Sequence, residues 1–158
     1  MTGGLPVETL RLRHASLNDA KRLFDWSTAL QPDAPTAWGE PVWDDHLTRL
    51  ERSLGRTDRL IFIGEAVRTD QAIGALRFDA IGTGLWAIYI VVAPEFRGRG
   101  WSRKLLSAGL EHFDEADFAA RLPLNELRAR ALFGGMGFER AGTSSGSALY
   151  RFSRRRAA

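Results

Sequence analysis

Hydrophobic positions along the chain follow two periods, one typical of strands and one typical of helices. Polar and apolar residues alternate over 9–13, and the segment 16–30 carries apolar residues at helical spacing behind a capping-box pattern that begins at Ser16. A second amphipathic segment spans 43–54, after a loop rich in proline and glycine over 32–41. The first third of the chain is therefore predicted to form one strand followed by two helices.

Three strand-like runs follow, over 59–67, 72–81 and 85–92. The connections between them contain four and three residues, lengths that join antiparallel neighbours. The later elements are predicted as a helix after residue 100, a short strand near 119–122, a helix over 126–133, and strands near 138–141 and 148–152. The predicted order is β-α-α-β-β-β-α-β-α-β-β.

The junction between the fourth strand and the third helix carries a basic, glycine-rich loop, Arg97-Gly98-Arg99-Gly100. A strand that turns into a helix here leaves backbone N–H groups unpaired at the positive end of the helix dipole. Glycine lets an anion approach these groups, and the two arginines add fork-shaped donors for phosphate oxygens. The loop is predicted to bind an anion such as a pyrophosphate; the alternative is a plain surface turn whose arginines face water.

Spacing argues against two other phosphate-binding loops. A P-loop needs four residues between its glycines and then Lys followed by Ser or Thr, whereas one residue separates Gly98 from Gly100. A dinucleotide fingerprint needs a third glycine where this chain has Arg103, and the preceding strands look antiparallel. The loop therefore indicates neither an ATPase nor a dehydrogenase.

Composition limits the remaining classes. The chain has 158 residues, of which 44% are hydrophobic, enough for a single domain over 1–158, and a flexible basic tail is expected at 154–158. The net charge is +3, but the arginines are interspersed with nearly as many acidic residues, so nucleic-acid binding is not favoured. No cysteine and three scattered histidines make a metal site unlikely to form. Without a long apolar run, we expect no membrane contact and a cytoplasmic location.

The segment from Ala93 to Ser102 resembles the pyrophosphate-binding motif, Q/R-x-x-G-x-G/A, of the GCN5-related N-acetyltransferase (GNAT) family. Arg97 and Gly100 match this motif, and Ser102 replaces the usual Gly or Ala. The region from Arg128 to Phe138 is similar to the family's later helix and the strand after it. The resemblance implies an α+β fold with a central mixed, mostly antiparallel sheet of about seven strands, splayed after the fourth and flanked by about four helices.

The same resemblance implies acetyl-CoA as co-substrate and no metal, and homodimers are common in the family. Backbone groups of the fourth strand would pair with the pantetheine arm, and amides of the loop would hold the pyrophosphate. The cofactor-binding residues implied in this way are Ile90, Val91, Val92, Arg97, Gly98, Arg99, Gly100, Trp101, Ser102, Asn125 and Phe133.

Two catalytic positions of the family are altered in this sequence. Phe133 stands where a tyrosine commonly protonates the leaving thiolate, and Ala87 stands where an acidic residue often acts as base. Tyr89, Tyr150 or a water would then supply the proton, unless the thiolate leaves without an acid. His46 and Asp79 are the candidate bases, each with an ordinary structural role as its alternative.

Segments around Trp26, Trp43-Asp44-Asp45-His46 and 73–79 resemble the subgroup that acetylates the 4-amino group of nucleotide-linked amino sugars, on the route to pseudaminic-type sugars of flagellin. This resemblance implies a UDP-amino-sugar acceptor contacted by Trp26, Trp43 and His46. Two alternatives remain open. One is another amine, such as a protein N-terminus, a polyamine or an aminoglycoside, and the other is a non-catalytic module that binds acyl-CoA or nucleic acid.

Overall fold

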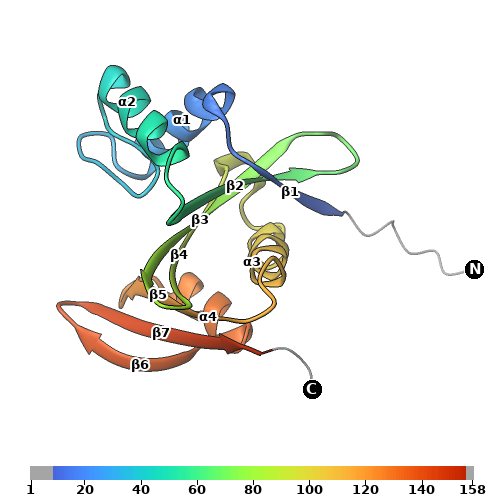
Figure 1. Cartoon of the computed structure of the whole chain (residues 1–158), viewed down its shortest axis with the longest axis vertical. Coiled ribbons are helices and arrows are strands. Elements are labelled where there is room, and N and C mark those ends of the chain that lie inside the picture. The colour runs from blue at the N-terminus through green and yellow to red at the C-terminus, as the bar shows by residue number, and fades with distance from the viewer. Residues whose placement is uncertain (1–8, 156–158) are drawn as a thin grey trace, which may run out of the picture.

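Seven strands and four α-helices make up residues 9–155, the part of the chain that the computed structural model describes (Figure 1). They follow the predicted order, with two 3-10 turns, η1 at Leu17–Asp19 and η2 at Pro94–Phe96, added to it. The elements are β1 (Leu10–His14), α1 (Ala20–Leu30), α2 (Trp43–Leu54), β2 (Arg59–Ala66), β3 (Ala72–Gly82), β4 (Leu85–Val92), α3 (Trp101–Glu111), β5 (Ala116–Pro123), α4 (Leu127–Gly135), β6 (Glu139–Ser144) and β7 (Ser147–Arg154).

The strands form one open sheet in the order β1-β2-β3-β4-β5-β7-β6. Every neighbouring pair is antiparallel except β4 and β5, which run parallel. Their pairing joins Leu85–Ala87 to Asp117–Ala119 and then stops, although both strands continue. This confirms the predicted mixed sheet that splays after its fourth strand.

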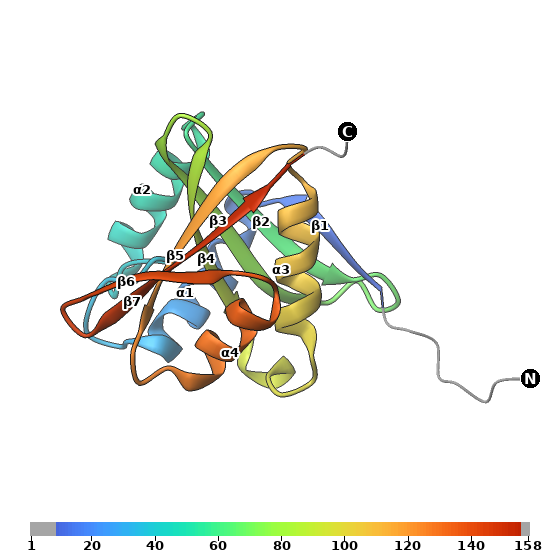
Figure 2. The same cartoon turned by 90° about the horizontal axis from the view of Figure 1, so that it is seen from below.

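Helices cover both faces of the sheet, as Figure 2 shows for α2 and α3 on opposite sides. α1 and α2 pack on a core that includes Ile61, Ile63, Ala75 and Val91. The intervening strand positions point the other way because side chains alternate along a strand. These positions, among them Phe62, Leu76, Phe78 and Ile88, pack with α3 and α4 in the larger core. The β4 residues on the α1/α2 face therefore include Ala87, Tyr89 and Val91.

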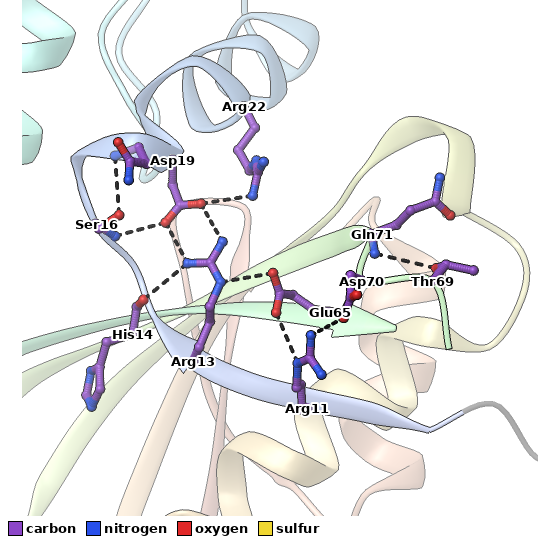
Figure 3. Close-up of polar contacts among 11 residues, drawn as sticks. Arg11, Arg13, His14, Ser16, Asp19, Arg22, Glu65, Thr69, Asp70 and Gln71 are labelled. Atoms are coloured by element: carbon purple, nitrogen blue, oxygen red, sulfur yellow. Dashed lines mark hydrogen bonds and ion pairs between the residues drawn. The ribbon is translucent and has the colours of Figure 1, made fainter. Parts of the chain in front are cut away.

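The first turn is fixed by the capping box that the sequence predicts. The Ser16 side chain accepts from a backbone amide while the Asp19 carboxylate accepts from the Ser16 amide at 2.8 Å. Asp19 also accepts two hydrogen bonds from Arg13, at 2.7 and 2.8 Å, and one from Arg22 at 2.9 Å (Figure 3). Glu65 joins Arg13 to Arg11, so the network ties α1 to strands β1 and β2.

The predicted start of the flexible tail, residue 154, is placed too early in the chain. Arg154 belongs to β7, pairs with Ala116, and donates from Nε to the carbonyl of Phe113 at 2.8 Å. Arg155 donates to the carboxylate of Asp117 at 2.8 Å. The tail prediction is wrong for these two residues because ladder and side-chain hydrogen bonds hold them, and residues 156–158 lie outside the described part of the chain.

Candidate functional site: a splayed strand and an anion-binding loop

The gap between β4 and β5 exposes backbone groups of β4. The amide of Ala93 donates to the carbonyl of Ile73 at 2.7 Å, which fixes the alternation along the antiparallel pair of β3 and β4. Residue 91 therefore turns its backbone groups toward β3, whereas Ile88, Ile90 and Val92 turn theirs toward the gap. Of the three β4 residues predicted to pair with a pantetheine arm, Ile90 and Val92 have the required backbone direction and Val91 does not.

The loop after β4 has backbone geometry that would suit the predicted anion cradle. Gly98 and Gly100 have φ angles of 76° and 82°, and Gly100 is the N-cap of α3. Both angles lie in the left-handed region, which costs side chains other than glycine about 1–2 kcal/mol. Within residues 9–155 the backbone amides of residues 98–102 donate to no group of the chain. These donors stand free at the positive end of α3.

Side chains around this cradle lock its shape. Arg97 donates from Nε to the carbonyl of Val92 at 3.2 Å, which ties the loop to the splayed end of β4. Arg99 lies over the ring of Phe96, with 5.8 Å between its guanidinium carbon and the ring centroid. Trp101 is buried, whereas Ser102 is partly exposed on the first turn of α3. A Cβ placed at Gly98 or Gly100 would meet no protein atom within 4 Å, so the space above the loop is open to a ligand.

The α4 side of the site carries the two remaining cofactor candidates. Asn125 is exposed in the turn before α4, and Phe133 is 1% exposed, with its ring 5.0 Å from that of Phe138. A buried phenyl ring lines the core and transfers no proton. The hydroxyl of Tyr150 accepts from Nε of Arg130 at 3.3 Å on this side of the sheet.

Two rungs of the sheet place charged side chains beside the gap, on the α1/α2 face. Arg59, Asp79 and Ala87 are consecutive partners across β2, β3 and β4, and Ala87 is the last β4 residue that pairs with β5. On the next rung, Arg77 lies opposite Tyr89, and its guanidinium carbon is 5.1 Å from the centre of the tyrosine ring. The splay therefore opens next to a row of ionised groups.

Asp79 is held between two arginines. It accepts from Arg77 at 2.7 and 2.9 Å and from Arg59 at 2.9 Å. Burial by itself favours the protonated acid, but the hydrogen bonds and charges of Arg77 and Arg59 outweigh it and lower the pKa of Asp79. A carboxylate with a lowered pKa is a weak base, and this one orients Arg77, whose Nη1 also donates to the carbonyl of Ala37 at 2.6 Å.

His46 lies buried between α1 and α2 rather than at the gap. Its Nε2 is 2.7 Å from the carbonyl of Ala20, and within residues 9–155 its Nδ1 has no hydrogen-bond partner. Burial is the main cause that lowers the pKa of His46. His46 lines a cavity of about 20 Å³, room for one water, together with Arg77 and Trp38.

The predicted acceptor aromatics differ in exposure. Trp26 is 6% exposed and packs in the α1/α2 core, which matches the structural alternative for this residue. Trp43 is 39% exposed at the start of α2, with its ring 5.2 Å from Phe24 and 5.7 Å from His46. Trp43 therefore offers a free aromatic surface to a ligand, and Trp26 does not.

Sequence reasoning missed Arg59 and Arg77. The signal was present for Arg77, because Arg77 and Asp79 stand two apart in a predicted strand and so share one face. The place of Arg59 in the site could not be predicted from sequence, since its contact with Asp79 depends on the register between β2 and β3. Both arginines lie on the α1/α2 face of the sheet, and Arg77 is buried there.

In this structure β4 separates from its parallel neighbour β5 and leads into a helix N-terminus whose backbone amides are free. This arrangement is typical of a class of protein that binds an extended, anionic acyl carrier. The sequence profile of the acetyltransferase (GNAT) family matches residues 22–138. The chain belongs to this family and is an N-acetyltransferase with acetyl-CoA as its co-substrate. No curated protein matches the chain at a significant level.

Solved structures agree on the fold. The spermidine N-acetyltransferase of Vibrio cholerae in complex with CoA and spermine has a TM-score of 0.76 at 16% identity, covering 92% of this chain and 96% of that one. A dodecameric form of that enzyme scores 0.73 at 16% identity, over 90% and 91% of the chains. A domain from Methanocaldococcus jannaschii scores 0.76 at 20% identity, over 92% and 99%. The Vibrio cholerae structures are spermidine N-acetyltransferases, not the sugar N-acetyltransferases that the sequence resembles.

The sequence also predicts that the protein binds no metal and contacts no membrane. No cluster of three or more metal-ligating side chains occurs in the described part of the chain. The helices within residues 9–155 are all too short or too polar to cross a membrane. The loop and strand around the gap fit acetyl-CoA instead: Arg97, Gly98 and Gly100 would hold its pyrophosphate, and Ile90 and Val92 its pantetheine amides.

Proposed function

We propose that the protein acetylates the primary amine of a small acceptor that also carries negative charge, and that this acceptor is a UDP-linked 4-amino sugar. The observation that carries the proposal is the excess of arginine on the acceptor face. Arg59 and Arg77 share the single carboxylate of Asp79, so one positive charge is left uncompensated beside the gap. The exposed ring of Trp43 adds a surface for stacking of a base or sugar.

A polyamine is the second candidate acceptor, because several structural relatives are spermidine N-acetyltransferases. Selection of a polycation requires free carboxylates near the reacting amine. Asp79, the carboxylate nearest the gap on β3, is already engaged by two arginines. This pairing supports an anionic acceptor over a cationic one.

The reaction requires a neutral amine, a held thioester and a proton for the departing thiolate. Acetyl-CoA supplies the activated acetyl group when it is bound. The loop amides and β4 fix the carrier, so the acceptor amine meets the carbonyl from the α1/α2 face in a ternary complex. Asp79, the carboxylate of β3 on this face, is paired with Arg59 and Arg77 and is a weak base, so the neutral amine is drawn from solution.

Tyr89 is the proton donor in this proposal. Tyr89 is the β4 residue of the acceptor face with a proton to give, since Leu85, Ala87 and Val91 are aliphatic, and it is 39% exposed next to the start of the splay. Phe133 cannot serve, and the hydroxyl of Tyr150 lies on the opposite side of the sheet.

Tyr89→Phe is expected to lower kcat about tenfold with little change in KM for acetyl-CoA, because a thiolate remains a fair leaving group without its acid. The check is steady-state kinetics of the wild type and of both variants with acetyl-CoA and the acceptor. Tyr150→Phe is the matched control, with an unchanged kcat. A wild-type kcat in Tyr89→Phe would remove Tyr89 from the mechanism.

The acceptor is tested by release of free thiol from acetyl-CoA in the presence of single amines. UDP-4-amino sugars are compared with spermidine, an aminoglycoside and a peptide with a free N-terminus. Turnover with the nucleotide sugar that exceeds turnover with the others supports the proposal. Faster turnover with spermidine would assign the enzyme to polyamines, and no turnover with any amine would leave only an acyl-CoA-binding role.

A further inference from the structure

A second anionic site is built into the outer face of α2. A groove of about 610 Å³ runs from the loop before α2 to the start of β2. Four arginines line it, Arg49, Arg52, Arg56 and Arg59, against the carboxylates of Glu40 and Asp45. Arg49 and Arg52 stand three residues apart in α2, which places them on one helical face, and Arg56 follows just after the end of the helix. The volume is in the range of small-molecule sites.

The positive charge in this groove is only partly neutralised. Arg56 is paired with Asp58, and Arg59 shares Asp79 with Arg77. Arg49 has a backbone carbonyl at 3.0 Å and a longer ion pair with Glu40 at 3.5 Å. Within residues 9–155, Arg52 forms no ion pair or hydrogen bond.

The lowered pKa of Arg49 agrees with a groove whose positive charge is only partly neutralised. Burial is the main cause that lowers the pKa of Arg49, and the charges of Arg77 and Arg59 lower it further. Glu40 and Asp79 act in the opposite sense without restoring the ordinary value. A guanidinium in this position is under-compensated, and a bound anion would relieve it.

Arg59 links the groove to the reaction site through the sheet. It lines the groove and is also the partner of Asp79, which lies opposite Ala87 at the start of the splay. Adjacent strands lie about 4.8 Å apart, so Arg59 is about 10 Å from β4 across the sheet. One molecule can therefore place an amine at the gap and an anionic group among the arginines.

A solvated helix face is the alternative to a binding site, because basic side chains near a helix C-terminus also complement its dipole. That explanation covers Arg52, in the last turn of α2, and Arg56 just after it. It does not cover Arg49 in the middle of the helix, or Arg59 on the neighbouring strand. Arginine is also the side chain best suited to bidentate contact with phosphate.

We infer that this groove binds a phosphate or diphosphate group, and that the group belongs to the acceptor of the acetyl transfer. The inference rests on the proposed function for the identity of the acceptor, and it names the part of the protein that recognises the acceptor's charge. Specificity for a nucleotide-linked amine would then arise from α2 and β2 rather than from the residues that touch the thioester.

The experiment measures binding of UDP by calorimetry to protein saturated with CoA, so that the loop before α3 is already filled. Arg52→Gln is expected to weaken UDP binding about tenfold, and Arg52→Lys less, because one charge-assisted contact is lost or altered. Arg68→Gln, at an exposed arginine of the β2–β3 turn, is the matched control and leaves the affinity unchanged. Higher salt weakens the binding further.

Three outcomes would overturn the inference: no binding of UDP to the CoA-loaded protein, equal binding by Arg52→Gln, or equally tight binding of inorganic phosphate, which would indicate a site for the free ion. A kinetic arm separates this result from the proposed function. With a nucleotide-linked amino sugar, Arg52→Gln should raise KM more than it lowers kcat. If no amino sugar is acetylated, the proposed function fails whatever the calorimetry gives. If only UDP binding is absent, the assignment of the groove as a phosphate site fails.

Discussion

Gly100→Val is expected to lower the affinity for acetyl-CoA at least about 100-fold. Gly100 caps α3 with a φ of 82°, an angle that a β-branched residue adopts only with strain. The valine would shift the backbone and aim the amides of residues 98–102 away from the pyrophosphate. Each charge-assisted hydrogen bond contributes about 1.5–3 kcal/mol, so the loss of two such bonds accounts for the factor.

The control for this variant separates strain from binding. Gly84, in the β3–β4 turn, has a φ of 66° and likewise has no protein atom within 4 Å of a built Cβ. It lies at the opposite end of β4 from the loop. Gly84→Val should therefore destabilise the fold by a similar amount while the affinity for acetyl-CoA stays unchanged. Calorimetry on both variants, with thermal unfolding alongside, makes the comparison; unchanged affinity in Gly100→Val would mean that the cofactor binds elsewhere.

The element order was accessible from sequence because each element is specified locally. Ser16 and Asp19 form the capping box that their spacing predicts, and the short turns around Asp70 and Thr83 join antiparallel strands. The loop around Gly98 was accessible for the same reason, since its positive φ angles and free amides follow from consecutive residues. Local chemistry therefore predicted both the fold and the cofactor loop.

The acceptor side of the site was harder to predict from sequence because it depends on contacts between residues that are far apart in the chain. Whether Asp79 acts as a base depends on Arg59, 20 residues away, and whether His46 meets the acceptor depends on how α2 packs on α1. Neither contact leaves a short-range pattern. The start of β5 at Ala116 was also missed, because Ala116 and Asp117 do not show a strand-like alternation on their own.

Asp19→Asn is expected to lower the free energy of unfolding by about 3–5 kcal/mol, the usual cost of removing one partner from a buried ion pair. The Asp19 side chain is 1% exposed, and it accepts from Arg13, Arg22 and the amide of Ser16 (Figure 3). An amide accepts fewer of these bonds and leaves Arg13 with only the carboxylate of Glu65, which Arg11 shares. Since the network joins α1 to β1, the loss also loosens the acceptor side of the site.

The pH dependence of this effect has a defined sign. Burial raises the pKa of Asp19, but the hydrogen bond from Arg13, the Ser16 amide and the nearby charges outweigh it, and the pKa is lowered. A carboxyl with a lowered folded pKa stabilises the protein above its unfolded pKa of about 3.9 and loses that contribution as pH falls through the folded value. The difference between wild type and Asp19→Asn should therefore be constant near neutrality and shrink below about pH 4.

Urea unfolding at pH 7 and at pH 3 measures both quantities on the same two proteins. Asp25→Asn is the matched control, because Asp25 forms an exposed pair with Lys21 at 2.9 Å, and such pairs contribute at most about 0.5 kcal/mol. If Asp19→Asn changed the stability no more than Asp25→Asn, or if the difference grew at low pH, the buried carboxylate would not be what holds α1 to the sheet. The acceptor face would then owe its position to apolar packing around Leu23 and Ile63 alone.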